Sequence, residues 1–445
     1  MSKPVCLVTA PIATRSGYGA HSRDICRALI KLDRYDVKIW NVRWGNTSMN
    51  ALVGDDPNDK ILIDRMLNEP KLSTQPEIHI HIVIPNEFET FGKYNIGITA
   101  GLEKTACPHE WIEGMNRMNM NIVPSTFVRD VMKNVHFDIA DDKTKEVKGS
   151  LKVENPIEVL FEGTDTNIYK KTNKFTKMLT DEMKNVEEPF NFLYVGHWLQ
   201  GNLGKDRKDT GMMLKVFLET FKDKKKKPGL IMKTSGATFS ILDREDILNR
   251  IKTVKESIQG DLPNVYLMHG DFTDDEMNEL YNHPKVKAHI NLTHGEGFGR
   301  PLLEASISQK PVIASNWSGH LDFLHKDNAV LVGGGLEEVP KESFPDYMHV
   351  EGSKWFTVNY QEASLRMKDV YTNYKKYTLN AKKLGIVNKS KFSLNAMTRE
   401  LGKILDKYVP EFPKEVKLEL PKLKKVDSDT ASTPTKIKLP KLKKV

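Results

Sequence analysis

The stretch NLTHGEGFGRPLLEASISQKPVIASNWS, residues 291–318, decides the fold. An apolar run at 288–292 predicts a buried strand, and a turn of glycines and small polar residues follows at 293–299. Residues 300–308 carry apolar side chains at helical spacing, with a proline in the first helical turn. Residues 311–314 predict the next buried strand. This order of strand, helix and strand forms a βαβ unit, which requires a parallel sheet.

The turn in this unit has the composition of an anion site. Gly295, Gly297 and Gly299 leave room for a ligand against the backbone, and free N–H groups at a helix start attract phosphate. Glu296 lies in the turn, and Glu304 follows about two helical turns later. These carboxylates cannot bind phosphate, but they can accept hydrogen bonds from the hydroxyls of a sugar or a ribose. Glycines and acids alone fit a plain strand–helix turn equally well.

Glu296-Gly-Phe-Gly-Arg-Pro-Leu-Leu-Glu304, followed by PVIAS, resembles the E-x7-E signature of family-four-like retaining glycosyltransferases of the GT-B fold. The resemblance implies that Glu296 contacts the hydroxyls of the donor sugar and that Glu304 binds the ribose of the nucleotide. It also implies that the backbone at Gly297, Phe298 and Gly299 approaches the diphosphate and the sugar.

The fold class implied by this resemblance is α/β, with two Rossmann-like doubly wound domains facing across a cleft and a disordered basic C-terminal tail. The expected parts are an N-terminal acceptor-side domain (1–165), a linker (166–188), a nucleotide-sugar-binding domain (189–360), helices that cross back to the first domain (361–410) and the tail (411–445). A charged stretch without periodicity at 138–154 predicts a loop or insertion, and two helices are expected at 360–383 and 391–408.

Composition places the chain among soluble globular proteins. Its 445 residues are 39% hydrophobic and 28% charged, and no apolar run approaches the ~20 residues that span a bilayer. The three cysteines lack metal-like spacing, so a reducing cytoplasm is the expected location.

The net charge of +8 is concentrated in the tail. Residues 414–445 hold ten Lys and four acids, a net charge of +6. The tail repeats a basic decamer at 417–426 and 436–445. Nucleic acid, an anionic membrane and a groove on a partner protein are its possible targets, and an inert solvated tail is the alternative.

Two places in the first domain are candidates for ligand contact. The loop APIATRSGYGA at 10–20 contains Gly17 and Gly19 and follows the first strand, where doubly wound folds bind phosphates. SGYG is equally consistent with a plain strand–helix turn. The T-x-x-x-E segment that ends at Glu103 resembles a segment of many family-four enzymes. The resemblance implies that Glu103 is a catalytic residue that lies at the cleft, near the acceptor.

The cations for a diphosphate are expected in the loop after the strand at 192–196, which ends in LQGNLGKDRKDTG. The resemblance implies a Lys before the next helix, matched by Lys208 with Arg207 beside it, and an Arg directly after the glycine of the strand. His197 occupies that second place, a departure for which Arg207 or Arg300 could compensate. Positioned cations stabilise the charge that develops on a leaving nucleotide diphosphate; a solvated loop is the alternative.

The function implied is a retaining, metal-independent hexosyl- or pentosyltransferase, with a nucleotide-diphosphate sugar as donor substrate and no cofactor. The acceptor stays open. A hydroxymethylated base in viral DNA is one hypothesis and rests on charge alone, while a glycan, a lipid or a protein are others. A non-catalytic GT-B scaffold that binds through its tail is the alternative from a different class, and the departure at His197 favours it.

Overall fold

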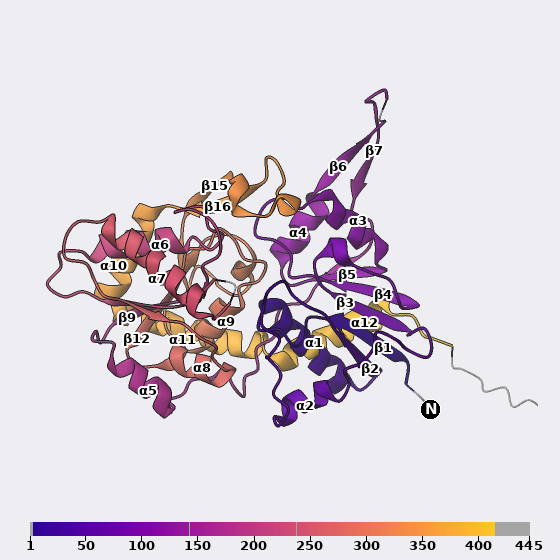
Figure 1. The fold of residues 1–445 in the computed structure, drawn as a ribbon, viewed down its shortest axis with the longest axis horizontal. Helices are drawn as coiled ribbons and strands as arrows, with labels where there is room; N and C mark the ends of the chain where they lie inside the picture. Colours follow the sequence, from indigo (N-terminus) through magenta and orange to yellow (C-terminus); the bar gives the residue numbers. More distant parts are fainter. Residues whose placement is uncertain (1–2, 142, 237, 414–445) are drawn as a thin grey trace, which may run out of the picture. The chain divides into compact units, whose positions relative to one another are not determined.

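The computed structural model describes residues 3–141, 143–236 and 238–413. The duplicated basic segment of the tail lies outside the described residues. Residues up to Pro410 form one compact unit, which contains two six-stranded parallel sheets (Figure 1).

The first sheet has the order β2-β1-β3-β4-β5-β8, and all its strands are parallel. Its strands are β1 Val5–Ala10, β2 Asp36–Asn41, β3 Ile78–Ile82, β4 Tyr94–Ile98, β5 Met120–Val123 and β8 Ile157–Val159. Its helices are α1 Gly17–Leu32, α2 Pro57–Ile63, α3 His109–Arg117 and α4 Thr126–Asn134, with a 3-10 turn η1 at Pro85–Glu87.

The second sheet has the order β11-β10-β9-β12-β13-β14, and it is also parallel throughout. Its strands are β9 Asn191–His197, β10 Gly229–Ser235, β11 Val265–Met268, β12 Val286–Asn291, β13 Val312–Ser315 and β14 Val330–Val332. Its helices are α6 Thr210–Phe221, α7 Ile241–Glu256, α8 Asp274–Asn282 and α9 Arg300–Ile307. The βαβ unit expected around residues 291–318 is therefore β12, α9 and β13.

The strand orders indicate where a ligand would bind. In a doubly wound sheet the ligand site lies at the carboxyl edge, at the point where the strand order reverses. That point lies between β1 and β3 in the first sheet and between β9 and β12 in the second. The loops after β9 and β12 are the ones that contain the expected cations and the glycine-rich turn.

The strands are buried because helices cover parallel sheets on both faces. All five residues of β3 are buried, including His79 and His81. His79 Nε2 lies 2.9 Å from the Thr9 hydroxyl, and His81 Nδ1 accepts the N–H of Glu89 at 3.0 Å. Burial lowers the pKa of both rings, to about 4 and about 3 respectively. These histidines are neutral parts of the core, and the described residues contain no group of three or more His, Cys, Asp or Glu that could hold a metal.

Three helices follow the second sheet, where the sequence predicted two. They are α10 Tyr360–Thr372, α11 Tyr374–Lys391 and α12 Leu394–Tyr408. Asn373 interrupts the first predicted helix, and Ser393 starts α12 by accepting the N–H of Ala396. The helix α12 packs on α1, where Arg34 pairs with Asp406. The helix α11 packs on α9. The C-terminal helices therefore contact one helix of the first sheet and one helix of the second.

Other elements lie outside the two sheets. The predicted loop at 138–154 contains an antiparallel hairpin, β6 His136–Ala140 with β7 Val147–Lys152, which projects away from the first sheet (Figure 1). A second hairpin pairs β15 Gly334–Glu338 with β16 Lys354–Val358 and encloses the 3-10 turns η3 Lys341–Ser343 and η4 Asp346–Met348. The expected linker contains α5 Lys177–Lys184, and η2 Gly319–Asp322 follows β13. Among the described helices none is long and apolar enough to cross a membrane.

Candidate active site

The centre of the candidate site is an ion pair between the two loops at the reversal point of the second sheet. Lys208 precedes α6 and donates from its ammonium to a carboxylate oxygen of Glu296, in the turn after β12. Both side chains are almost completely buried. The Glu296 N–H donates to the Ser318 hydroxyl at 2.9 Å, which fixes the turn from the other side.

The charges in this pair stabilise each other. Burial alone would raise the pKa of Glu296, but the charges of Lys208 and Arg207 outweigh it and hold the pKa below its usual value. Burial lowers the pKa of Lys208, and Glu296 offsets part of that effect. Glu296 is therefore an ionised acceptor, which is the state that accepts hydrogen bonds from sugar hydroxyls.

Arg207 connects this centre to the first half of the chain. Its guanidinium donates to the Glu103 carboxylate, in the loop that follows β4. Glu103–Arg207 and Lys208–Glu296 are thus two adjacent ion pairs, and the charge of Arg207 also acts on Glu296. The structure brings together both residues expected to be catalytic and both expected cations.

Two glycines of the turn have a role that the sequence did not indicate. A Cβ on Gly295 would lie 2.5 Å from the carbonyl oxygen of Glu103, and a Cβ on Gly297 would lie 2.0 Å from that of Ala100. Ser125 adds a third link, because its hydroxyl donates to the Gly297 carbonyl at 2.6 Å. These glycines allow two backbones to touch, and the ligand contact that the sequence predicted for them stays a prediction.

The third glycine starts the helix α9. Gly299 has φ 94°, a left-handed conformation that glycine adopts without strain. Phe298 beside it is buried and packs against Phe323 and Phe392. Phe298 therefore anchors the turn in the core with its side chain.

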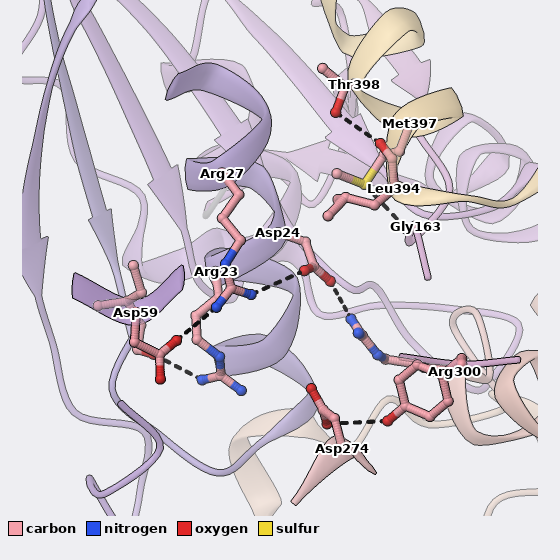
Figure 2. A network of polar contacts seen from close by, with 12 residues as sticks. Arg23, Asp24, Arg27, Asp59, Gly163, Asp274, Arg300, Leu394, Met397 and Thr398 are labelled. Carbon is pink, nitrogen blue, oxygen red and sulfur yellow. Dashed lines mark hydrogen bonds and ion pairs between the residues drawn. The ribbon is translucent and has the colours of Figure 1, made fainter. Parts of the chain in front are cut away.

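Arg300 and Glu304, both expected at the ligand, form a separate buried ion pair on α9. Figure 2 shows Arg300 bonded to Asp24 of α1, which extends the pair into a network. Arg300 lies 2.8 Å from Glu304 and 2.5 Å from Asp24 on α1. Asp24 lies 3.7 Å from Arg27, which also pairs with Asp59 at 2.7 Å. The network joins the first helix of the chain to the helix that follows the glycine-rich turn.

The second acid of the E-x7-E pattern differs from the first in its electrostatics. Burial raises the pKa of Glu304 to about 7, although Arg300 opposes the shift. The Tyr281 hydroxyl donates to its second oxygen at 3.3 Å. Glu304 can therefore change its protonation state near neutral pH, while Glu296 stays ionised.

The two glycines of the first loop are unequal. A Cβ on Gly19 would lie 2.2 Å from the Thr14 carbonyl oxygen, so this glycine is required for packing. A Cβ on Gly17 would meet no atom within 4 Å, so the backbone at Gly17 is open to a ligand. Between them, the hydroxyl groups of Tyr18 and Thr99 share a hydrogen bond of 2.9 Å. This bond connects the loop to the segment before Glu103.

His197, the departure from the family pattern, lies at the end of β9 beside the cations. Its side chain is exposed to solvent and bonds to the Ser235 hydroxyl at 3.2 Å. Partial desolvation lowers the pKa of His197, and the charges of Arg207 and Lys208 lower it further. A neutral imidazole can donate a hydrogen bond to a phosphate but adds no positive charge.

The sequence reasoning missed Glu162, which follows β8. Its carboxyl is 6% exposed and has no hydrogen-bond or ion-pair partner among the described residues. Burial raises the pKa of Glu162 to about 7, against the charge of Arg300, and Asp24, Glu304 and Glu296 raise it further. An acid beside a glycine at a strand end was visible in the sequence, but its neighbours come from distant segments.

The arrangement combines cations, a helix start and a hydrogen-bond acceptor in one place. Arg207 and Lys208 supply positive charge, the start of α9 supplies a helix N-terminus, and Glu296 supplies an acceptor for hydroxyls.

Comparison with known proteins gives a likeness in structure alone. No protein-family model matches the sequence, and no curated protein matches it. HepE of Anabaena, solved in complex with UDP and glucose, is 12% identical with a TM-score of 0.58, over 91% of this chain and 100% of that one. Sucrose-phosphate synthase of Thermosynechococcus elongatus is 12% identical with a TM-score of 0.59, over 91% and 98%. A glycosyltransferase of Rickettsia africae is 14% identical with a TM-score of 0.59, over 92% and 99%.

These likenesses cover almost the whole of each chain and agree with the two six-stranded parallel sheets. The chain therefore has the GT-B fold, with two Rossmann-like doubly wound domains.

Proposed function

We propose that this protein is a glycosyltransferase that moves a sugar from a nucleotide-diphosphate sugar to an acceptor hydroxyl. The observation that carries the proposal is the buried pair of Lys208 and Glu296 at the reversal point of the second sheet. A cation for the diphosphate and an acceptor for the sugar hydroxyls are both needed there, and they lie side by side. The solved complex of HepE with UDP-glucose supports a nucleotide sugar as the ligand class.

Each site residue has a role in this proposal. Lys208 and Arg207 bind the diphosphate and stabilise the charge that develops on it as the glycosidic bond breaks. Glu296 orients the sugar through its hydroxyls, and Glu304 binds the ribose. Glu103, paired with Arg207, borders the acceptor side.

We also propose that transfer proceeds with retention and without a metal ion. The resemblance to the E-x7-E enzymes supports retention, by attack of the acceptor on the face from which the phosphate leaves. The departing phosphate then accepts the proton of the acceptor hydroxyl. The clustering of Arg207 and Lys208 supports metal independence, because two cations can supply the charge that a metal would otherwise provide.

The test is a thermal-shift screen of nucleotide-diphosphate sugars, followed by a transfer assay with any sugar that binds. A ligand that binds only the folded state raises the Tm. Glu296→Ala should abolish transfer and keep the fold, as judged by its circular dichroism. The absence of any Tm shift across the panel, or full activity in Glu296→Ala, would overturn the proposal.

The acceptor we favour is a hydroxymethylated base in DNA, and the support for it is the charge of residues 414–445. Ten lysines in that segment would neutralise DNA phosphates and make binding strongly salt-dependent. A DNA affinity that falls by orders of magnitude between 50 and 200 mM salt in the full chain, and little in a chain ending at 413, is the expected result. Equal, flat salt dependence in both would remove DNA and leave glycan, lipid and protein acceptors.

The second candidate function is a non-catalytic binding protein on the same fold. His197 favours it, because a neutral imidazole stands where the resembled family has an Arg. His197→Arg distinguishes the two functions. An enzyme should bind its nucleotide sugar more tightly after this change, whereas a scaffold without a donor site should gain nothing.

A further inference from the structure

A buried histidine lies between the two loops of the site. His294 is two residues before Glu296, and its N–H donates to the Arg207 carbonyl at 3.3 Å. Its own carbonyl accepts the N–H of Phe356 at 3.0 Å. Its ring stacks on Trp355 at 3.9 Å between centroids, with 8° between the ring planes. The ring therefore has one fixed position between the site and the β15–β16 hairpin.

A buried aspartate faces this ring from the other loop. Asp209 directly follows Lys208, is completely buried and has φ 51°, a left-handed conformation that is uncommon for a residue with a side chain. The Tyr360 hydroxyl donates to its Oδ2 at 2.9 Å. Its Oδ1 lies 3.7 Å from His294 Nε2.

Among the described residues, the two facing atoms lack a hydrogen bond of normal geometry, although the backbone of Gly204 also lies near the His294 ring. Within the described part of the chain, Asp209 Oδ1 and His294 Nε2 are both buried without a hydrogen bond. Such atoms are costly, because each has lost its water and gained no replacement. A separation of 3.7 Å is too long for a hydrogen bond, and an approach of less than an ångström would make one.

The protons on the pair follow from its surroundings. His294 Nδ1 faces the Phe356 carbonyl at 2.8 Å, so it carries a hydrogen and donates it. One further proton then lies either on Asp209 or on Nε2. Both arrangements leave the pair neutral overall, whereas removing or adding a proton would leave an uncompensated buried charge.

We infer that Asp209 and His294 act as one buried pair that sets the spacing between the turn of Lys208 and the turn of Glu296, and so positions the nucleotide-sugar site. Asp209 directly follows Lys208, and His294 lies two residues before Glu296. These are positioning residues, since neither contacts the ligand groups. The consequence for sugar binding rests on the proposed function, while the spacing itself does not.

The charged groups around the pair are few. Asp206 in the same loop, Glu337 on β15 and the Tyr360 hydroxyl on α10 face Asp209, and Glu337 also faces His294. Asp206 directs its carboxylate to the N–H groups of Thr210 and Gly211, at 2.9 and 3.3 Å. The side chains that act on the pair are therefore acidic or neutral, and none of those named is a cation.

Hydrogen–deuterium exchange on the full chain tests the spacing without any ligand. We expect Asp209→Asn to speed amide exchange at 293–297 as well as in its own loop. His294→Gln should speed exchange at 206–210 as well as in its own turn. The matched control is His289→Gln, which changes a buried histidine on β12 that bonds to Ser308 at 3.2 Å and lies outside the pair. Exchange that changes only around each substituted residue, or that rises equally in the control, would overturn the inference.

Titration with UDP-glucose tests the consequence for the site. Each single variant should bind it about tenfold more weakly than the wild type, and the double variant should bind it no more weakly than either single one, because one unit is lost once. Unchanged affinity, or losses that multiply in the double variant, would overturn the positioning role. If the wild type binds no nucleotide sugar while the reciprocal exchange effect is present, the pair stands and the proposed function fails.

Discussion

Arg300 on α9 lies 2.5 Å from Asp24 on α1, so the residue that ends the glycine-rich turn is bonded to the first helix of the chain (Figure 2). The exposed fractions of the two side chains are 14% and 5%. Glu304 shares the same guanidinium at 2.8 Å. One arginine therefore bonds to two buried carboxyl groups, one on a helix beside the first sheet and one on a helix beside the second.

Arg300→Met should destabilise the protein strongly. Removing one member of a buried ion pair leaves uncompensated charge and costs about 3–5 kcal/mol. Denaturant unfolding is the measurement. Arg34→Met is the control, since Arg34, two residues after the end of α1, also reaches a distant helix, but through an exposed pair with Asp406 that is worth less than about 1 kcal/mol. Equal losses in both variants would show that the Arg300 network adds no more than a surface pair.

Lys208→Met should weaken nucleotide-sugar binding, in addition to the stability that is lost when Glu296 is left without its buried partner. A hydrogen bond to a charged group is worth about 1.5–3 kcal/mol, which corresponds to a loss of about 10- to 150-fold in affinity. Isothermal titration with UDP-glucose measures it. Lys215→Met on α6, whose side chain is only a weak surface partner of Glu219, should leave the affinity unchanged. A wild-type affinity in Lys208→Met would remove the lysine from the diphosphate site.

Gly297→Ala and Gly17→Ala should distinguish a glycine that is needed for backbone packing from one that leaves the backbone open to a ligand. The new Cβ at 297 would lie 2.0 Å from the Ala100 carbonyl oxygen, so the backbones must part, at a cost of about 1–3 kcal/mol. At 17 the methyl group meets nothing within 4 Å, and alanine is the better helix former, so stability should hold or rise. Thermal melting measures the stability of both variants, and titration with UDP-glucose measures their affinity. We expect Gly17→Ala to keep normal stability and to bind UDP-glucose more weakly. Normal stability in Gly297→Ala would contradict it.

The unit β12–α9–β13 could be predicted because its signals are local. Glycines, Pro301 and two short apolar runs fix a turn, a helix start and two buried strands within the stretch itself. A family pattern that spans both loops predicted that Lys208 and Glu296 belong to one site, but it did not predict that they form an ion pair. The GT-B fold was predicted in the same way.

Other features could not be predicted, because their causes are not local. Gly295 and Gly297 are required by carbonyl groups about 190 residues away in sequence. The hairpin β6–β7 lacks a clear alternating pattern, since most of its residues are exposed and only Phe137 and Leu151 pack on the core. Asp209 and His294 are ordinary polar residues in sequence, and they become notable only when two loops meet in a buried space.

Glu162→Gln should stabilise the protein at alkaline pH and have little effect in mild acid. The folded-state pKa is about 7, above the value of about 4.3 in an unfolded chain. Below pH 4 both states are protonated and the carboxyl costs nothing. As the pH rises from about 4.5 to 7 the unfolded state releases its proton first, so folding stability falls, by up to about 4 kcal/mol above pH 7.

Glutamine keeps the shape and cannot ionise, so it escapes that loss. The measurement is the Tm difference between Glu162→Gln and the wild type at pH 4 and pH 8.5, which should be small at the first and clearly positive at the second. Glu154→Gln, which changes an exposed acid of the same half, should show no such dependence on pH. A constant difference at both pH values would mean that Glu162 stays ionised in the folded protein throughout, and that a cation or a bound water stabilises it there.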